Sequence, residues 1–133
     1  MTSPNEFDFD ELRMYVSADE NGASLFVSIA SGFADFEVRV PLNEKDLQVL
    51  QTDSERSAFL QAALHQPFQL RQTALSEIEQ RKYLDIILHS SVAEVERFLT
   101  TLDHGSANGA ISNMLRITRG RNQQTMRSGR WFA

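Results

Sequence analysis

The sequence predicts an α+β fold, with an N-terminal antiparallel three-stranded meander followed by four or five helices packed on one sheet face. The hydrophobic period is two residues up to residue 42 and changes to helical spacing beyond it, where the helix-capping signals also lie. A length of 133 residues, 41% of them hydrophobic, suits one core. We therefore expect a single domain over residues 1–133. Whether the acidic segment 1–11 and the basic tail 121–133 are peripheral to it stays open.

The three strands are predicted by apolar side chains that alternate with polar ones, which is the pattern of a half-buried strand. Residues 12–18 form the first stretch, and the Asn21-Gly22 pair that follows is a strong hairpin signal. Residues 24–30 and 34–42 repeat the alternation. The side chains expected to face the core are Leu12, Met14, Val16, Leu25, Val27, Ile29, Phe36, Val38 and Val40, whereas Asp35, Glu37 and Arg39 are expected to face water.

Helical spacing begins after Asn43, which is a suitable N-cap for a helix that buries Leu47 and Leu50. A second helix is expected over residues 53–66, and Pro67 is expected to end it. Its apolar side chains form one stripe, which consists of Phe59, Leu60, Ala63 and Leu64.

Two capping boxes of the form S-x-x-E predict the next two helices, and they begin at Ser76 and Ser91. A last helix is expected within residues 106–120, where the apolar side chains again have helical spacing. The segment 82–90 stays open between helix and strand, because its run YLDIIL fits either pattern.

The formal net charge of −5 conceals an uneven distribution. Residues 1–112 carry all 18 acids and 8 of the 13 bases, which gives −10, whereas residues 113–133 carry five arginines and no acid, which gives +5. An acidic body is a poor binder of nucleic acid, because a phosphate backbone attracts cationic surface. Such a body suits a basic protein partner, which its field steers towards it.

Targeting and redox signals indicate a cytoplasmic protein. The chain has no cysteine, and it has no apolar run long enough for a membrane helix. Its start, MTSPNEFDFDE, lacks the basic and apolar regions of a secretory signal. We therefore expect a cytoplasmic location and no membrane partner.

No catalytic or metal-binding motif is recognisable. His65, His89 and His104 are too widely spaced for a common metal motif, and His65 and His104 are expected at helix C-termini, where a cation complements the helix dipole. No serine lies in a G-x-S-x-G or S-x-x-K motif, and no loop has the spacing of a P-loop. The stretch GSANG is either a turn between helices or a generic anion site at a helix start. We expect no catalytic residue, metal or cofactor.

Paired carboxylates are the remaining enzymatic alternative. Asp35 and Glu37 share the wet face of the third predicted strand, and such a pair can support hydrolysis or hold a divalent cation. A solvated strand face has the same pattern, and catalytic use requires burial that shifts a pKa. A carboxylate-based hydrolase is therefore the less favoured alternative.

The C-terminal stretch RITRGRNQQTMRSGRWFA combines five arginines with Trp131 and Phe132. Such a patch can contact phosphates and stack on a base. The alternative is that the segment folds back on its own acidic body, with the two aromatic side chains as anchors. We favour the second interpretation, because five positive charges are set against a body of −10. It predicts that Trp131 is buried and that at least one of Arg116, Arg119, Arg121, Arg127 and Arg130 pairs with a carboxylate of the chain.

In size, acidity and strand-then-helix order, the whole chain resembles the bacterial toxin-immunity proteins of the contact-dependent growth inhibition type. The resemblance implies a stoichiometric inhibitor of a cognate protein toxin, often a nuclease whose basic groove attracts acids that imitate phosphate. The oligomeric state stays open between a monomer and a homodimer, since an uncapped edge strand can pair with a second copy. A small adaptor or chaperone of a secretion or phage system is the alternative binding function.

A toxin-binding surface is expected to combine carboxylates with a few apolar anchors. Two clusters of acids fit this description. The expected contact residues are Asp35 and Glu37 on the third strand, and Glu77, Glu79, Glu94 and Glu96 on two successive helices.

Overall fold

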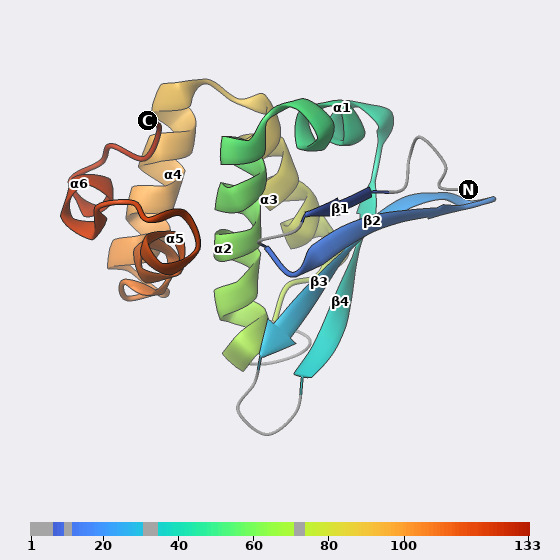
Figure 1. Cartoon of the computed structure of the whole chain (residues 1–133), viewed down its shortest axis with the longest axis horizontal. Helices are drawn as coiled ribbons and strands as arrows, with labels where there is room; N and C mark the ends of the chain where they lie inside the picture. The colour runs from blue at the N-terminus through green and yellow to red at the C-terminus, as the bar shows by residue number, and fades with distance from the viewer. Residues whose placement is uncertain (1–6, 10–11, 31–34, 71–73) are drawn as a thin grey trace.

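The computed structural model describes residues 7–9, 12–30, 35–70 and 74–133 (Figure 1). In these ranges one antiparallel sheet with the strand order β1-β2-β3-β4 is followed by six helices. The elements are β1 (Phe7–Phe9), β2 (Met14–Asp19), β3 (Gly22–Ala30), β4 (Asp35–Leu42), α1 (Glu44–Thr52), α2 (Ser54–Leu70), α3 (Glu77–His89), α4 (Val92–His104), α5 (Ala110–Arg119) and α6 (Gln123–Arg127).

The helices form two layers on the same side of the sheet (Figure 1). In the first layer α2 packs against β3 and α3 packs near β4, and α1 contacts both helices. In the second layer α5 packs against α2, with α4 and α6 beside it. The α+β prediction is confirmed, and α2 lies between the sheet and the second layer of helices.

The sheet contains one strand more than the three predicted. The predicted strands correspond to β2, β3 and β4, and β1 pairs antiparallel with β2. Residues 7–9 of the acidic N-terminal segment are thus part of the sheet rather than peripheral, and the other residues of segment 1–11 lie outside the described ranges. The alternation Phe-Asp-Phe is too short to be told from chance in the sequence.

The strand register places one set of apolar side chains on the helix-covered face. Met14 lies opposite Val27, which in turn lies opposite Val38, and all three are buried. The predicted β2–β3 hairpin is present, but its two-residue loop is Glu20-Asn21, one position before the expected pair. Gly22 then begins β3 with a φ of +126°, which residues with a side chain rarely adopt.

Helix α2 is buried on all sides through its middle. Every residue from 57 to 65 is buried, including polar Ser57 and Gln61. A helix that is covered on one face shows a single apolar stripe, whereas a helix between two layers has no wet face. The predicted stripe is therefore part of a wider contact surface, because α2 meets β3 on one side and α5 on the other.

Pro67 does not end this helix, contrary to the prediction. α2 continues to Leu70, with Pro67 inside it. Proline in a helix interior costs about 3 kcal/mol, because one hydrogen bond is lost and its ring crowds the preceding turn. Phe68 is 1% exposed, and burying a phenylalanine contributes about 1.5–3 kcal/mol, so the packing of the last turn offsets much of that cost.

His65 lies inside α2 rather than at a helix end, because the helix continues past Pro67. The imidazole is buried, and its Nε2 lies 3.4 Å from the backbone nitrogen of Ala30, which donates a hydrogen bond to it. An imidazole that accepts at Nε2 is neutral with its proton on Nδ1. Burial, and then the charge of Arg13, lower the pKa of His65 below its usual 6.5.

This lowered pKa predicts a pH-dependent contribution to stability. Below pH 6.5 the unfolded chain binds a proton at His65 before the folded chain does, so the free energy of unfolding falls as the pH drops from 6.5 towards the folded pKa. His65→Gln retains an acceptor for Ala30 and removes the titration. Urea titrations of both proteins across pH 5–7 should show that the variant loses this component, and parallel pH profiles would contradict the assignment.

α3 and α4 begin as predicted, whereas α6 is a sixth helix within the tail, where no helix was expected. Ser76 and Ser91 are the N-caps of α3 and α4, and the segment 82–90, left open by the sequence, falls almost entirely within α3. α5 has Gly109 as its N-cap, which offers no side chain. The buried carboxylate of Asp103 in α4 replaces that cap, since its Oδ1 accepts a hydrogen bond of 3.0 Å from the backbone of Ser112.

The carboxylate of Asp103 also lies where the sequence suggested an anion site, at the GSANG stretch of residues 105–109. Oδ2 of Asp103 has no hydrogen-bond donor among the described residues, but Nη1 of Arg127 lies 3.6 Å away as an ion-pair partner. The N-terminus of α5 is therefore occupied by an acid of the chain itself. His104 ends α4 as expected, and its Nε2 lies 2.7 Å from the carbonyl oxygen of Arg127.

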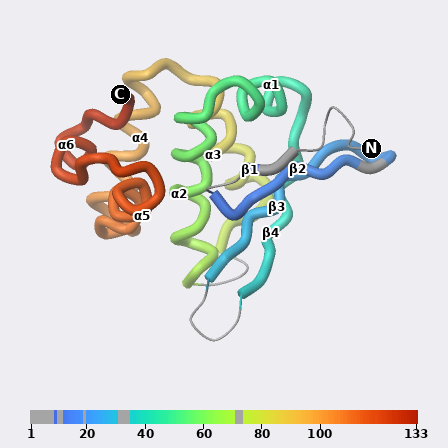
Figure 2. Tube along the Cα trace, in the orientation of Figure 1, coloured from blue at the N-terminus to red at the C-terminus, as the bar shows by residue number. Residues whose placement is uncertain are grey.

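The C-terminal segment folds back over the second helical layer and ends beside α4 (Figure 2). Trp131 has 0% exposure, as predicted, and Arg121 forms an ion pair with Glu55 of α2 at 2.9 Å. The Phe132 ring packs edge-on against Phe59, with ring centroids 5.0 Å apart. The tail 121–133 therefore packs on the domain and contributes Met126 and Trp131 to its core.

Candidate binding groove between β4 and α3

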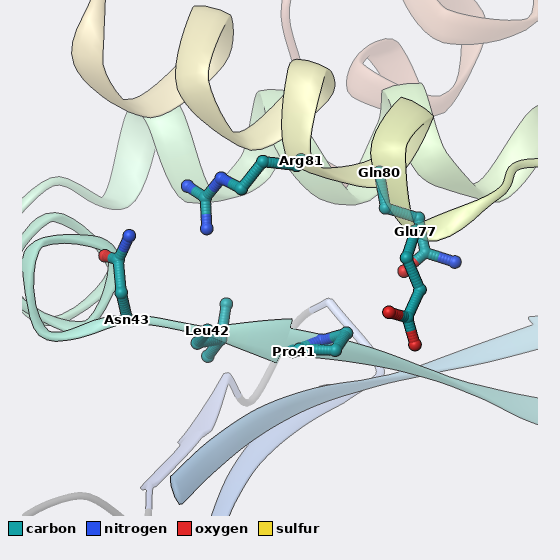
Figure 3. A pocket seen from close by; sticks show the side chains of 6 residues that line it. All are labelled: Pro41, Leu42, Asn43, Glu77, Gln80 and Arg81. Carbon is teal, nitrogen blue, oxygen red and sulfur yellow. The ribbon is translucent and has the colours of Figure 1, made fainter.

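A groove runs between β4 and the first turns of α3, and we call it the β4–α3 groove. It consists of two adjoining hollows of about 430 and 220 Å³, which share Glu77 and Gln80 in their walls. Figure 3 shows the smaller hollow, with the α3 side chains above and the end of β4 below. Residues 37–39 and 41–43 form the strand side, and residues 75–77, 80 and 81 form the helix side together with Phe68 of α2.

The groove follows the outer edge of β4 rather than one face of the sheet. Glu37, Val38 and Arg39 all line the larger hollow, although Val38 is buried and its two neighbours are exposed. Consecutive strand residues point to opposite faces, so a hollow that touches all three lies beside the backbone. β4 is the last strand of the sheet, and within the described ranges its backbone hydrogen bonds go to β3 alone.

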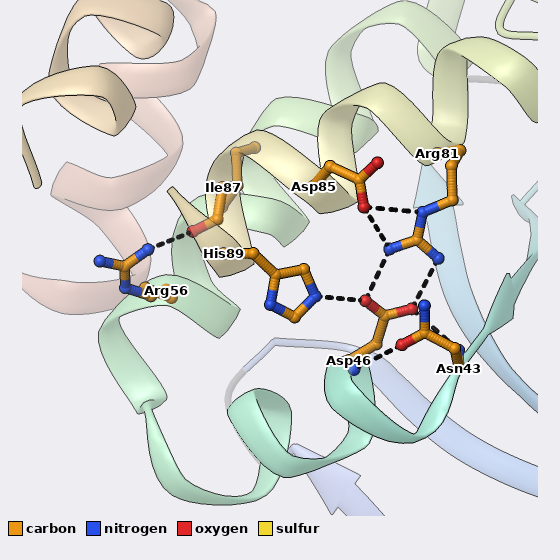
Figure 4. A network of polar contacts seen from close by, with 7 residues as sticks. All are labelled: Asn43, Asp46, Arg56, Arg81, Asp85, Ile87 and His89. Atoms are coloured by element: carbon orange, nitrogen blue, oxygen red, sulfur yellow. Dashed lines mark hydrogen bonds and ion pairs between the residues drawn. The ribbon is translucent and has the colours of Figure 1, made fainter. Parts of the chain in front are cut away.

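Asp46 holds α3 in its place beside β4. Its carboxylate has 0% exposure and lies in the first turn of α1, directly after β4. Two N–H groups of Arg81 donate to it at 2.8 and 2.7 Å, and Nε2 of His89 lies 2.7 Å from Oδ1 (Figure 4). The backbone of Asn43 donates to Oδ2 at 2.9 Å and completes the capping box of α1. Because Arg81 also lines the groove, this network positions the helical wall.

The charge state of Asp46 follows from these partners. Burial acts to raise its pKa, but hydrogen bonds from Arg81, from the Asn43 backbone and from His89 outweigh the burial, and the pKa lies below its ordinary 3.8. The carboxylate is therefore ionised at neutral pH and pairs with the guanidinium. Arg81 also donates to the exposed Asp85 at 2.9 Å, so its charge is neutralised within the network.

A second contact ties the C-terminus of α3 to α2. Nη1 of Arg56 donates to the carbonyl oxygen of Ile87 at 3.1 Å (Figure 4). It also donates to the carbonyl oxygen of Ser90 at 2.9 Å. These carbonyls lie at the end of α3, where backbone acceptors lack partners within the helix. α3 is thus held to α1 and α2 by polar contacts near both of its ends.

Two of the six predicted contact residues meet at the groove. Glu37 of β4 and Glu77 of α3 both line the larger hollow, one from each wall. Glu37 accepts a hydrogen bond of 3.2 Å from the Tyr15 hydroxyl. No described cation forms an ion pair with either carboxylate. Both acids are therefore available to a cationic partner.

Asp35 and Glu79 lie next to these two residues but already have partners. Asp35 begins β4 and forms an exposed ion pair of 3.2 Å with Arg13. Glu79 lies in the first turn of α3, where it completes the capping box by accepting a hydrogen bond of 3.1 Å from the backbone of Ser76. Their predicted contact with a partner would compete with these bonds.

Glu94 and Glu96 lie on α4, away from the groove. Glu94 is exposed in the first turn of the helix. Glu96 serves the C-terminal segment, because its Oε2 accepts hydrogen bonds from the backbones of Trp131 and Phe132 at 2.7 and 3.2 Å. The sequence gives no sign of this second role, which joins residues 35 and 36 positions apart.

Gln80 is a groove residue that the sequence reasoning missed. It is 7% exposed, and its Nε2 donates to the carbonyl oxygen of Leu75 at 3.2 Å. Its Oε1 is buried and has no hydrogen-bond donor in the described part of the chain. The available signal was its spacing from Leu84 and Ile87, which places Gln80 on the apolar side of α3.

Comparison with known proteins gives no family for this chain: no protein-family model matches it, and neither a curated protein nor a solved structure shows significant similarity. Within the described ranges, no three or more His, Cys, Asp or Glu side chains are grouped as a metal site would require. No helix in these ranges combines the length and apolarity needed to cross a bilayer.

Proposed function

We propose that this chain binds a basic protein partner at the β4–α3 groove, and that it is an immunity protein that neutralises a bacterial toxin domain. The observation that carries the proposal is the pair Glu37 and Glu77, two carboxylates on opposite walls of one groove that form no ion pair with any described cation. Leu75 supplies half-buried apolar surface between them, whereas Val38 and Phe68 line the same hollow but are almost fully buried. Apolar anchors within a charged rim are the usual composition of a protein interface.

Charge supports a basic partner. The chain has a net charge of −5, and complementary charge steers encounter and raises the association rate. Arg81 adds little positive potential, since Asp46 and Asp85 neutralise it. Two carboxylates and two guanidiniums line the groove, namely Glu37 and Glu77 with Arg39 and Arg81.

The same residues favour binding over the hydrolase alternative. Asp35 has 59% side-chain exposure and is paired with Arg13, and Glu37 is exposed beside Tyr15. A general acid or base usually needs burial or a close like charge to tune its proton affinity. Exposed carboxylates at a rim act through their charge, which is the property that an inhibitor of a basic protein uses.

Co-expression with the protein encoded by the neighbouring upstream gene tests the proposal. We expect that protein to arrest growth when expressed alone, and we expect this chain to restore growth and to co-purify with it at a fixed ratio. A neighbour that is harmless alone and does not co-purify would contradict the immunity function. A harmless neighbour that does co-purify would instead identify the adaptor function.

A further inference from the structure

We infer that the partner enters the β4–α3 groove as an extended segment that pairs with the free edge of β4 and becomes an additional strand of the sheet. The identity of the partner rests on the proposed function. The mode of binding rests on the edge strand, the groove beside it and the unpartnered acceptor of Gln80.

The first support is the backbone of β4. An edge strand presents a row of unpaired N–H and C=O groups, one set at every second residue. β4 is eight residues long, and its outer edge faces the groove rather than a neighbouring strand. Pro41 cannot donate a hydrogen bond, so pairing is expected over residues 35–40.

The second support is the difference between the two sides of the groove. An added strand presents alternate side chains to opposite faces. On the helix-covered side it would meet Leu75 and Glu77, beside the buried Val38 and Phe68. On the open side of the sheet it would meet Glu37. The segment that fits alternates apolar residues with lysine or arginine.

Gln80 provides a third and independent observation. Among the described residues its Oε1 has no donor, and the side chain is more than nine-tenths buried and lines both hollows. Buried acceptors without donors are rare in folded proteins, because leaving them unpaired is costly. A backbone N–H or side-chain amide of the incoming segment would supply the missing donor.

A second copy of the chain fits the groove less well than a single segment. The β4 strand of a second copy has α3 beside it. Pairing of the two β4 edges would therefore bring the α3 helices of both copies into the same space. It would also bring Glu37 and Glu77 of both copies to the same edge, where like charges repel. A cationic extended segment avoids both problems.

The test uses capped peptides and isotope-labelled full-length chain, observed by NMR. One peptide has four Val-Lys repeats, the second has four Val-Glu repeats, and the third is the Val-Lys peptide with two adjacent central prolines. We expect the Val-Lys peptide to shift resonances of residues 35–43 and 75–81 and to slow hydrogen exchange at alternate β4 amides. Binding elsewhere, or equal binding of the proline peptide, would overturn strand addition.

Two variants sharpen this experiment. Glu37→Lys combined with Glu77→Lys should weaken binding of the Val-Lys peptide roughly tenfold, since two rim charges are reversed. Gln80→Met keeps the side-chain length, removes the acceptor and should weaken it about fivefold. An unchanged affinity in both folded variants would place the peptide outside the groove.

The outcomes separate this inference from the proposed function. Peptide binding at β4 without neutralisation of the neighbouring gene's product would support strand addition and contradict the immunity function. Neutralisation in which the β4 amides exchange as fast in the complex as in the free chain would support the immunity function and overturn strand addition.

Discussion

Trp131→Ala is expected to lower the free energy of unfolding by about 3–5 kcal/mol, the range for a buried large aromatic side chain. Trp131 has 0% exposure, and its ring meets Phe59 edge-on at a centroid distance of 6.4 Å. Its Nε1 also donates to the hydroxyl of Thr100 at 2.9 Å, so the truncation leaves a cavity and an unpaired hydroxyl. The free energy of unfolding of a domain is only about 5–15 kcal/mol, so this loss is a large fraction of the total stability.

The measurement is urea unfolding followed by far-ultraviolet circular dichroism, because Trp131 is the chain's one tryptophan and its fluorescence disappears in the variant. Arg130→Ala is the matched control, one residue earlier and exposed. It should change the free energy of unfolding by no more than about 0.5 kcal/mol. A loss below about 1 kcal/mol for Trp131→Ala would show that the C-terminal segment is not part of the core.

Asp46→Ala is expected to lower the free energy of unfolding by about 3 kcal/mol, as is usual when one partner of a buried ion pair is removed. The substitution leaves Arg81 with Asp85 alone and removes the acceptor for the Asn43 backbone. The cost should be nearer the low end of such losses, because the Arg81 side chain is 35% exposed and water can solvate it. Asp85→Ala is the control, with 59% side-chain exposure and an expected cost below about 1 kcal/mol.

The Asp46 carboxylate also predicts a pH-dependent stability. Here hydrogen bonds favour the charged form of the side chain, whereas at His65 burial favours the neutral form. The pKa of Asp46 is lowered in the folded chain, so its stabilising contribution is complete above pH 3.8 and is lost as the pH falls through the folded pKa. Acid unfolding of Asp46→Asn, measured by circular dichroism, should therefore lack this part of the pH dependence. Wild-type and variant stabilities that fall in parallel below pH 3.8 would contradict a lowered pKa.

Much of the fold could be predicted because local signals agree with it. Alternating apolar residues indicate β2, β3 and β4, and serine caps with a glutamate three residues later indicate the starts of α3 and α4. The predictions that α2 ends at Pro67 and that His65 lies at its C-terminus were wrong for the same reason. Local propensity ends a helix at proline, whereas packing of Phe68 between the layers carries α2 on to Leu70.

The candidate site could be predicted only in part, because it depends on contacts between distant residues. The alternation in β4 and the first turn of α3 indicate that Glu37 and Glu77 are exposed, but their meeting across one groove requires the tertiary structure. Arg81 reaches Asp46 across 35 residues, and Glu96 reaches the backbone of Trp131 across 35 residues. Capping patterns and hydrophobic periods report neighbours within a few positions and do not record such pairs.

The dissociation constant of the complex with the neighbouring gene's product tests the central claim most directly, and calorimetry on purified proteins measures it. The comparison is between Glu37→Lys with Glu77→Lys, at the groove, and Glu94→Lys on α4. Glu77 and Glu94 both lie in the first turn of a helix, so both substitutions lose a similar helix-dipole interaction. We predict that the double variant binds at least about tenfold more weakly and that Glu94→Lys binds like the wild type. Equal weakening by Glu94→Lys, or unchanged binding of the double variant, would contradict a partner site at the β4–α3 groove.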